Sequence, residues 1–233
     1  MGNEVILPGD PPIELVLKPS ARARRLSLRV SRLDGRVTLT LPKNASRRHA
    51  LAFAEDQAGW IRRQLAGQAQ GTRPMPGTQL PIGGEAQKIL TNHGLRSPRL
   101  TEAGIEVPAR DPERTPARLA AFLKLEARGA LAEAVEHYAD ALGVTHGKIT
   151  LRDTRSRWGS CSSTGDLMFS WRLIMAPPEV LDYVVAHEVA HLIEMNHSRA
   201  FWAVVAQVCP DYKAPRQWLH DNAPSLHRYR FRD

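Results

Sequence analysis

Apolar and polar residues alternate in two short stretches near the N-terminus, and this pattern predicts β-strands. Apolar side chains occupy every second position in residues 26–30, and residues 37–41 repeat the pattern. Such an alternation places one face of a strand against a core and the other face in solvent. Asp34 and Gly35 lie between the two stretches and form a common hairpin turn sequence. The two stretches therefore predict an antiparallel hairpin.

The sequence of the remaining N-terminal part predicts a helix followed by a loop and short strands. We expect the helix over residues 46–66, with Ser46 as its N-cap, because a serine hydroxyl can accept a hydrogen bond from the first turn. A loop rich in Gly and Pro follows, and further strands are expected over residues 86–91 and 104–109. Residues 1–107 are therefore predicted to form a small, basic, β-rich α+β module.

The C-terminal part begins around the helix-breaking stretch "RDPERTPAR" and has a different pattern. Apolar residues recur at helical spacing over residues 115–142, and Gly143 is a suitable residue to end that helix. Two strands are predicted on either side of a turn at residues 162–166, and the proline pair at 177–178 then opens a further helix. Residues 108–233 are therefore expected to form a second domain of the α+β class.

The composition is that of an ordinary globular protein. The chain has 233 residues, of which 42% are hydrophobic and 24% charged. Its two cysteines, Cys161 and Cys209, are too few for a disulfide framework, so a reducing compartment is expected. The N-terminal "MGNEVILPGD" lacks the features of a signal peptide, and no apolar run approaches the roughly 18 residues of a membrane span. We expect a cytoplasmic protein without a membrane partner.

The net charge of +8 is unevenly distributed along the chain. Residues 1–107 contain 16 Lys and Arg against 9 Asp and Glu, a net charge of +7, whereas residues 108–233 contain 16 against 15. A basic surface of this kind attracts nucleic acid, nucleotides or other polyanions. The same excess is also consistent with a solvated face that keeps the protein soluble, because no aromatic-rich nucleic-acid motif accompanies it. The sequence leaves both interpretations open.

The stretch "VVAHEVAHLIEMNHS", residues 184–198, places polar residues on an otherwise apolar helix. His187 and His191 are four residues apart, so their side chains share one helix face and can bind one metal ion. Glu188 follows His187 directly and points around the helix, where it can take a proton from a water on the metal without being a ligand. This is the pattern of a hydrolytic zinc site.

A hydrolytic zinc site has three protein ligands, so a third must come from outside this pair. One solution is a glutamate on a later helix, but the sequence contains no glutamate after Glu194. The other solution is a histidine just beyond a turn, and His197 is well placed for it. We expect the helix to end near Glu194 or Met195, and Asn196 to take a left-handed conformation that turns the chain back.

The alternative interpretation of the three histidines is structural. A bare H-E-x-x-H motif also arises by chance, and a lone histidine on an apolar face is usually a hydrogen-bonded core residue. The apolar surroundings "LDYVVAHEVAHLI" favour metal binding, because unpaired polar groups in such a helix cost free energy. We therefore predict one divalent ion, with zinc favoured by three imidazoles and another divalent metal as the alternative.

The segment "RSRWGSCSSTGDLMFSWRLIMAPPEVLDYVVAHEVAHLIEMNHSRAFW" resembles the YgjP-like metal-dependent hydrolases, which are relatives of the SprT-like zinc proteases. The dense match covers residues 155–218, and residues 13–107 are similar more loosely. The resemblance implies a zincin-like metallopeptidase fold with "SRWGSC" beside the site. It implies zinc ligands and a catalytic base at these positions: His187, His191 and His197 for the ion, and Glu188 for the base. Ser170 departs from the family pattern, in which asparagine is expected before the tryptophan.

The reaction expected from this resemblance is hydrolysis of a peptide or protein. A metal-bound water activated by Glu188 would attack the peptide carbonyl, and the strand "DLMFSW" would border the cleft and pair with an extended substrate. Tyr212 is a candidate donor of a hydrogen bond to the developing oxyanion. Fold and metal alone do not fix the substrate.

Two alternatives use the same residues differently. The first is a metal-dependent nucleoside triphosphate pyrophosphohydrolase or phosphohydrolase. In it Arg155, Arg157 and Arg172 would hold the phosphates, since a guanidinium group matches phosphate oxygens with paired hydrogen bonds. The second is a nucleic-acid-binding module with a structural zinc ion. An open fourth coordination position and the adjacent Glu188 argue against this second alternative.

Overall fold

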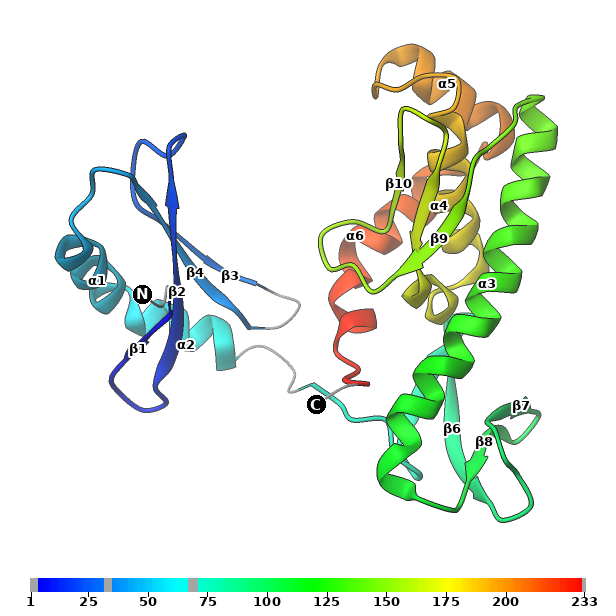
Figure 1. Cartoon of the computed structure of the whole chain (residues 1–233), viewed down its shortest axis with the longest axis horizontal. Helices are drawn as coiled ribbons and strands as arrows, with labels where there is room; N and C mark the ends of the chain where they lie inside the picture. The colour runs from blue at the N-terminus through cyan, green and yellow to red at the C-terminus, as the bar shows by residue number, and fades with distance from the viewer. Residues whose placement is uncertain (1–3, 32–34, 67–70, 232–233) are drawn as a thin grey trace. The chain divides into compact units, whose positions relative to one another are not determined.

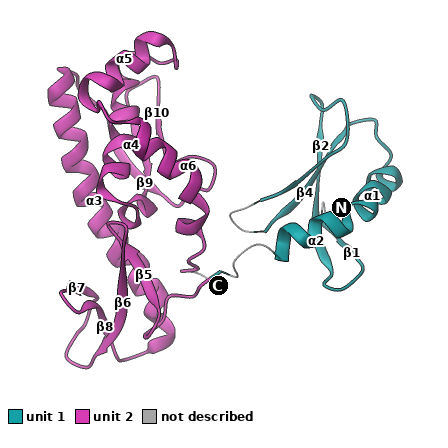
Figure 2. Ribbon diagram, turned by 180° about the vertical axis from the view of Figure 1, so that it is seen from behind, with its two compact units in different colours: residues 1–71 teal, residues 72–233 magenta. Residues whose placement is uncertain are grey.

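The computed structural model describes residues 4–31, 35–66 and 71–231, and the chain forms two compact units (Figures 1 and 2). Unit 1 comprises residues 1–71 and unit 2 comprises residues 72–233. Both units mix helices with small sheets, which confirms the predicted α+β class.

Unit 1 is a four-stranded sheet that packs against two helices. Its elements are β1 (Glu4–Leu7), β2 (Ile13–Ser20), β3 (Ser27–Val30), β4 (Val37–Pro42), α1 (Arg47–Asp56) and α2 (Ala58–Ala66). The strand order is β1-β2-β4-β3, in which β2 and β4 are parallel and the outer pairs are antiparallel. Alternate residues of β2 and β4 are buried with apolar residues of both helices: Ile13, Leu15, Leu17, Val37, Leu39, Leu41, Ala50, Ala54 and Ile61. The sequence alternation therefore marks the face of the sheet that forms the core.

The predicted hairpin is confirmed as the antiparallel pair β3 and β4, in which Leu28 lies opposite Leu39. Gly35, close to the turn, has a positive φ of 71°, which its lack of a side chain permits. Asp34, the other predicted turn residue, lies outside the described residues.

The helix expected over residues 46–66 is divided into α1 and α2. Gln57 separates them, with φ and ψ of −90° and 1°, outside the range of a regular α-helix. Ser46 does occupy the N-cap position of α1, but its side chain makes no capping hydrogen bond. The local pattern thus predicted the helical stretch but not its interruption.

Within the described residues, unit 2 contains two sheets, one long helix and three shorter α-helices. Its strands are β5 (Gln79–Ile82), β6 (Glu85–Asn92), β7 (Arg99–Thr101), β8 (Gly104–Pro108), β9 (Ile149–Arg152), β10 (Gly159–Cys161) and β11 (Leu167–Ser170). Its helices are α3 (Thr115–Leu142), α4 (Pro178–Ala190), α5 (Arg199–Val208) and α6 (Lys213–His227), with 3₁₀ turns η1 (Pro112–Arg114) and η2 (Trp171–Met175). The sheet orders are β5-β6-β8-β7 and β10-β11-β9. Every described helix is too short or too polar to cross a membrane.

The boundary predicted between residues 107 and 108 does not coincide with the division of the structure, which falls after residue 71. Leu80 and Ile105, on strands β5 and β8, are fully buried in the same core as Leu119 of α3. The first sheet of unit 2 therefore belongs to the same compact body as the long helix. The stretch "RDPERTPAR", which indicated a domain boundary in the sequence, leads directly into α3 within unit 2.

Helix α4, which carries the histidine motif, lies in the middle of unit 2. The long helix α3 has the predicted range, and Gly143 ends it in the left-handed conformation, with φ of 64°. Helix α4 packs along α3 and also contacts α5, α6 and strand β10 (Figure 1). The surrounding elements thereby fix the position of the residues that α4 presents.

Candidate metal centre and active site

Helix α4 carries His187 near its C-terminal end, and His191 is its C-cap residue. The helix begins with Pro178, which suits a first turn because the missing N–H would have no partner within the helix. The regular helix ends at Ala190, earlier than the end expected at residues 194–195. The backbone tightens there, since the N–H of Leu192 donates to the carbonyl of Val189, three residues back.

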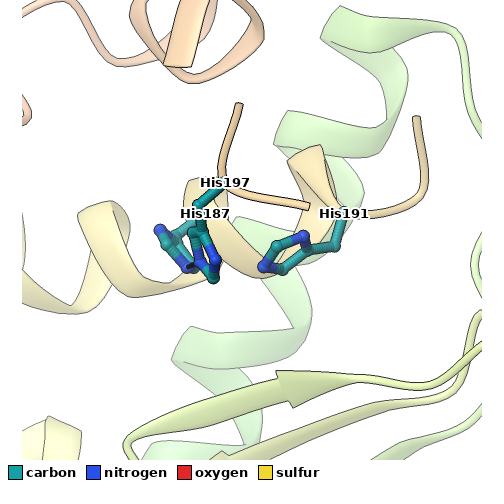
Figure 3. A group of neighbouring side chains, drawn as sticks. All are labelled: His187, His191 and His197. Atoms are coloured by element: carbon teal, nitrogen blue, oxygen red, sulfur yellow. Dashed lines mark hydrogen bonds between the residues drawn. The ribbon is translucent and has the colours of Figure 1, made fainter. Parts of the chain in front are cut away.

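The three histidines of the motif come together at this end of α4 (Figure 3). His187 and His191 lie one helical turn apart, and His197 returns from the segment after the helix. One nitrogen atom from each ring lies within 4.8 Å of the other two. The Nε2 atoms of His187 and His197 are 3.0 Å apart. Two nitrogens bound to one tetrahedral zinc ion are about 3.3 Å apart, given Zn–N bonds of about 2.0–2.1 Å. The donor set and its spacing therefore fit a single divalent ion.

A backbone carbonyl orients the ring of His191. Its Nδ1 lies 2.9 Å from the carbonyl oxygen of Glu194, so Nδ1–H donates and Nε2 keeps its lone pair for a metal ion. The Nδ1 atom of His187 is buried and has no hydrogen-bond partner among the described residues. The Nε2 atoms are thus the candidate ligand atoms in this cluster.

Two polar side chains build the turn that brings His197 back. The Oδ1 atom of Asn196 accepts a hydrogen bond of 2.9 Å from the backbone N–H of Ser198. The hydroxyl of Ser198, the N-cap of α5, accepts one of 3.3 Å from the N–H of Phe201. The expected left-handed conformation of Asn196 is wrong, since Asp111 is the one described non-glycine residue with a positive φ. The side chain of Asn196, rather than an unusual backbone angle, supports the turn.

Two aromatic residues of α5 support the imidazole rings. Phe201 is fully buried, and its ring stacks on that of His191 at a centroid distance of 4.5 Å. The same ring lies 4.9 Å from the rings of His187 and His197. The ring of Trp202 lies 5.7 Å from that of His187 and 6.1 Å from that of His197. Packing against Phe201 and Trp202 therefore restricts the orientation of the three imidazole rings.

Burial keeps the imidazole of His187 neutral. It lowers the pKa of His187 to about 3, with further contributions from the neighbouring His191 and His197 and from the charge of Arg216. Burial also lowers the pKa of His191. Metal ions bind the neutral form of imidazole, so His187 is ready to ligate at neutral and mildly acidic pH.

Glu188 lies beside the histidines and is only 7% exposed. Burial raises the pKa of its carboxyl to about 7, while a hydrogen bond from the backbone of Cys161 and the charge of Arg157 oppose the rise. A carboxyl group with a pKa near the working pH is suited to accept a proton and return it. Among the described residues, the group close enough to share an ion contains the three histidines and not Glu188. The geometry therefore separates the candidate ligands from the candidate base.

Strand β10 lies against Glu188, and this approach requires glycine at position 159. A Cβ atom on Gly159 would lie 2.5 Å from Cγ and 2.6 Å from Oε1 of Glu188, far inside van der Waals contact. The segment "SRWGSC" is thus beside the site, as the family resemblance implied. A glycine within a strand pattern is a known signal of close backbone approach, but the sequence does not say what it approaches.

The strand that borders the site is β10 rather than β11. The stretch "DLMFSW", to which substrate pairing was assigned from the sequence, contains β11. Strand β11 lies in the middle of its sheet and pairs with β10 on one side and β9 on the other, so neither edge is available. An extended chain that pairs with this sheet beside Glu188 must therefore use the outer edge of β10.

The sequence matches a family model over most of its length. The model, described as YgjP-like, metallopeptidase domain, matches residues 24–222. This chain belongs to the YgjP-like metallopeptidase family. The match includes the three histidines, Glu188 and strand β10, so the family assignment and the site geometry concern the same residues. A metallopeptidase family implies a metal cofactor, and the histidine cluster of this YgjP-like chain can hold one.

Among solved structures, the YgjP-like chain is similar to the metallopeptidase zymogen of Pyrococcus abyssi abylysin, with 24% sequence identity and a TM-score of 0.36. The likeness covers 39% of this chain and 93% of the abylysin chain. No curated protein matches the chain at a significant level. The family assignment therefore rests on the match to the YgjP-like model.

Three further residues predicted from the sequence lie in loops of this YgjP-like domain. Arg155 and Arg157 are exposed between β9 and β10, and Arg157 is close enough to Glu188 to lower the pKa of that carboxyl. Tyr212, just before α6, stacks on Trp202, with ring centroids 5.1 Å apart and an interplanar angle of 20°. The structure thus brings Arg157 and Tyr212 to the surroundings of the site, and Arg155 lies in the same loop as Arg157.

Arg172, the fourth predicted substrate-binding residue, has a structural role instead. Its side chain is buried and forms an ion pair with Asp153, with an Nε–Oδ1 distance of 2.7 Å. Its Nη1 donates to the carbonyls of Leu226 and Tyr229. These contacts hold the C-terminal segment against the core and contradict a phosphate-binding role, because the guanidinium donors are already used within the fold.

Tyr183 and Arg216 are residues of the site's surroundings that the sequence pattern did not predict. Tyr183 precedes His187 by four residues, and their ring centroids are 5.9 Å apart. Burial raises the pKa of Tyr183 to about 12. Arg216 of α6 places its Cζ 4.7 Å from the ring centroid of Trp202. Helical spacing alone could have identified Tyr183, whereas nothing in the local sequence links Arg216 to the histidines.

Proposed function

We propose that this chain is a zinc-dependent peptidase in which His187, His191 and His197 hold the ion and Glu188 is the catalytic base. One observation carries the proposal: three imidazoles converge beside a buried carboxyl group that is not part of the ligand set. Membership of the YgjP-like family supports a metallopeptidase-like hydrolase. Three imidazole ligands favour zinc among the divalent ions.

Each residue has a separate task in the proposed reaction. A zinc ion held by the three histidines would act as a Lewis acid toward the scissile carbonyl and the attacking water. Glu188, which lies outside the ligand set, accepts the proton of that water and passes it to the leaving amine. The backbone N–H of Cys161 donates a hydrogen bond to the carboxylate of Glu188, and the absence of a side chain on Gly159 leaves room for it. The outer edge of β10 retains backbone hydrogen-bonding groups for an extended peptide in addition to the N–H of Cys161 that bonds Glu188, which favours a peptide substrate.

The two alternatives have weaker support. Of the three arginines assigned to the phosphates of a nucleotide, Arg155 and Arg157 remain, because Arg172 is committed to Asp153 and to backbone carbonyls. A structural zinc ion in a nucleic-acid-binding module would need four protein ligands, whereas the described cluster offers three.

The substitution Glu188→Gln tests the proposal, since it retains the shape of the side chain and removes the proton acceptor. Elemental analysis should find the same zinc content in the variant and in the wild-type chain. Hydrolysis of an unfolded protein substrate should fall by about 10²-fold or more. Unchanged turnover would show that Glu188 is not the base. Hydrolysis of nucleoside triphosphates by the wild-type chain, with no cleavage of any polypeptide, would overturn the peptidase assignment.

A further inference from the structure

An aromatic ring holds Arg216 beside the histidine cluster. The Cζ atom of Arg216 lies 4.7 Å from the ring centroid of Trp202, in a cation–π arrangement. Trp202 in turn lies 5.7 Å from the ring of His187 and stacks on Tyr212. The guanidinium group is therefore at most about 10 Å from the ring of His187. The packing of Trp202 fixes this cation near the place where the reaction would occur.

The hydrogen-bond donors of Arg216 have no carboxylate partner among the described residues, and the residue is exposed. A guanidinium group that stacks on an aromatic face keeps the donors along its edge available. Arg172 provides the contrast, because its side chain is buried and its donors are taken by Asp153 and by backbone carbonyls. Arg216 is thus positioned in the manner of a binding residue rather than a structural one.

The surroundings of Arg216 favour an anionic ligand. Lys213, Arg216, Gln217 and His220 lie on one face of α6 and line an open depression of about 420 Å³. Asp221 is engaged by the side chains of Gln217 and His220. The charges of Lys213 and Arg216 are therefore not neutralised by a described carboxylate on their own helix face.

The charge of Arg216 also acts on the site itself. After burial and the two other histidines, it is a further cause of the lowered pKa of His187. Burial raises the pKa of Tyr183, and the charge of Arg216 opposes that rise. The geometric observation remains the position of the Arg216 guanidinium group over Trp202, which lies beside His187.

We infer that Arg216 is a specificity-determining residue that binds an Asp or Glu side chain of the substrate close to the scissile bond. The inference rests on the proposed peptidase function. A guanidinium group binds a carboxylate through two parallel hydrogen bonds, which neither an amide nor an apolar side chain reproduces. An extended chain advances about 3.3–3.6 Å per residue. A reach of about 10 Å therefore places the acidic side chain within about three residues of the bond that is cleaved.

The test compares peptide pairs that differ by Asp or Asn at a single position, up to about three residues on either side of the cleaved bond. For the zinc-loaded wild-type chain, kcat/KM at the best position should favour Asp by about 10-fold or more, the usual size of a charge-assisted hydrogen bond. Arg216→Gln should abolish the preference for Asp over Asn. Arg216→Glu should instead prefer a peptide with Lys at that position over the peptide with Asp. Arg128→Gln, which removes an exposed arginine of α3, is the matched control and should retain the ratio.

Binding of the same peptides to the Glu188→Gln chain separates this inference from the proposed function. One outcome is binding that requires both the Asp side chain of the peptide and Arg216, without cleavage by the wild-type chain. This outcome would support carboxylate recognition by Arg216 and refute the peptidase proposal. Cleavage with no preference between Asp and Asn would overturn the inference alone. Binding of a nucleoside triphosphate that depends on Arg216, with no preference among peptides, would assign the cation to phosphate and overturn it as well.

Discussion

The two units of the chain differ in where they place polar groups. Residues 1–71 contain 12 Lys and Arg against 6 Asp and Glu, whereas residues 72–233 contain 20 against 18. Among the described residues, every buried polar or charged residue lies in unit 2: Thr115, Ser170, Arg172, Glu188 and His191. Unit 1 thus combines an apolar core with a basic surface. Unit 2 carries polar groups inside, where each costs free energy unless it has partners.

The buried polar groups of unit 2 are themselves of two kinds. Arg172 has a carboxylate and two carbonyls as partners, so its burial is compensated within the fold. Glu188 has no ion-pair partner among the described residues, and burial raises its pKa to about 7. Titratable groups whose pKa is shifted by burial are typical of functional sites. For these two ionisable groups, the contrast teaches that burial alone does not distinguish a structural residue from a candidate site residue, whereas the lack of a compensating ion-pair partner among the described residues does.

Among the substitutions that test this contrast, Gly159→Ala is expected to have the largest effect, a fall in kcat. The new methyl group would displace the carboxylate of Glu188, and misplacement of a catalytic group by about 1 Å can cost about 10²-fold in rate. We expect kcat to fall by about 10- to 10²-fold, with zinc content and KM almost unchanged. Gly129→Ala in α3 is the matched control, because no atom lies within 4 Å of its added Cβ. Equal kcat for both variants would refute the role of Gly159.

A smaller effect, on stability rather than turnover, is expected from Asp153→Asn. The change leaves the buried guanidinium of Arg172 without its charged partner, and should lower the free energy of unfolding by about 1–3 kcal/mol. Thermal or denaturant unfolding at neutral pH measures the difference, with Glu126→Gln on the exposed surface of α3 as the control. Zinc content should not change, because Arg172 does not belong to the histidine cluster.

The same pair predicts a pH dependence. Burial alone would raise the pKa of Asp153. Its hydrogen bond to Arg172 and the charge of that residue outweigh this effect, so the pKa of Asp153 is lowered overall. A carboxyl group whose pKa is lowered by folding stabilises the protein above its unfolded pKa, and this contribution is lost as the pH falls through the folded value. The stability difference between the wild-type chain and Asp153→Asn should therefore shrink below about pH 4. A difference that grew on acidification would contradict the ion-pair explanation.

The smallest effect on the site is expected from the basic surface of unit 1. Exchange of five exposed arginines for serine should leave the zinc content of unit 2 unchanged: Arg22, Arg24, Arg25, Arg47 and Arg48. If this surface recruits a polyanion, the changes should weaken DNA binding and reduce its dependence on salt, because fewer counterions are released. Titration of fluorescent single- and double-stranded DNA at two salt concentrations measures both. Absence of wild-type binding at low salt would assign the charge to a solvated face.

Local patterns in the sequence predicted the parts of the molecule that depend on neighbours along the chain. The spacing of His187 and His191 placed both rings on one face of α4, and the apolar period predicted the range of α3. The hairpin of β3 and β4 followed from strict alternation. In each case a period of about two or four residues determines which side chains share a face.

The features that the sequence did not predict depend on contacts between distant segments. The burial of Arg172 requires Asp153 and the C-terminal segment, which are separated from it along the chain. The packing of residues 79–108 into the core of unit 2 also arises only in the folded chain. The family resemblance implied that "SRWGSC" lies beside the site, but not that Gly159 approaches the side chain of Glu188 so closely. The sequence alone does not tell whether a given arginine or glycine has a structural role or a role in the reaction.

The zinc content of His197→Ala tests the central claim most directly, because His197 is the proposed ligand that lies outside the H-E-x-x-H motif. After dialysis against a weak chelator, the wild-type chain should retain one zinc ion, and His197→Ala should fall to background. His49→Ala, which removes an exposed histidine of unit 1, should retain zinc like the wild-type chain. Equal zinc content in the wild-type and His197→Ala chains, or no zinc in either, would contradict a metal centre built from these three histidines.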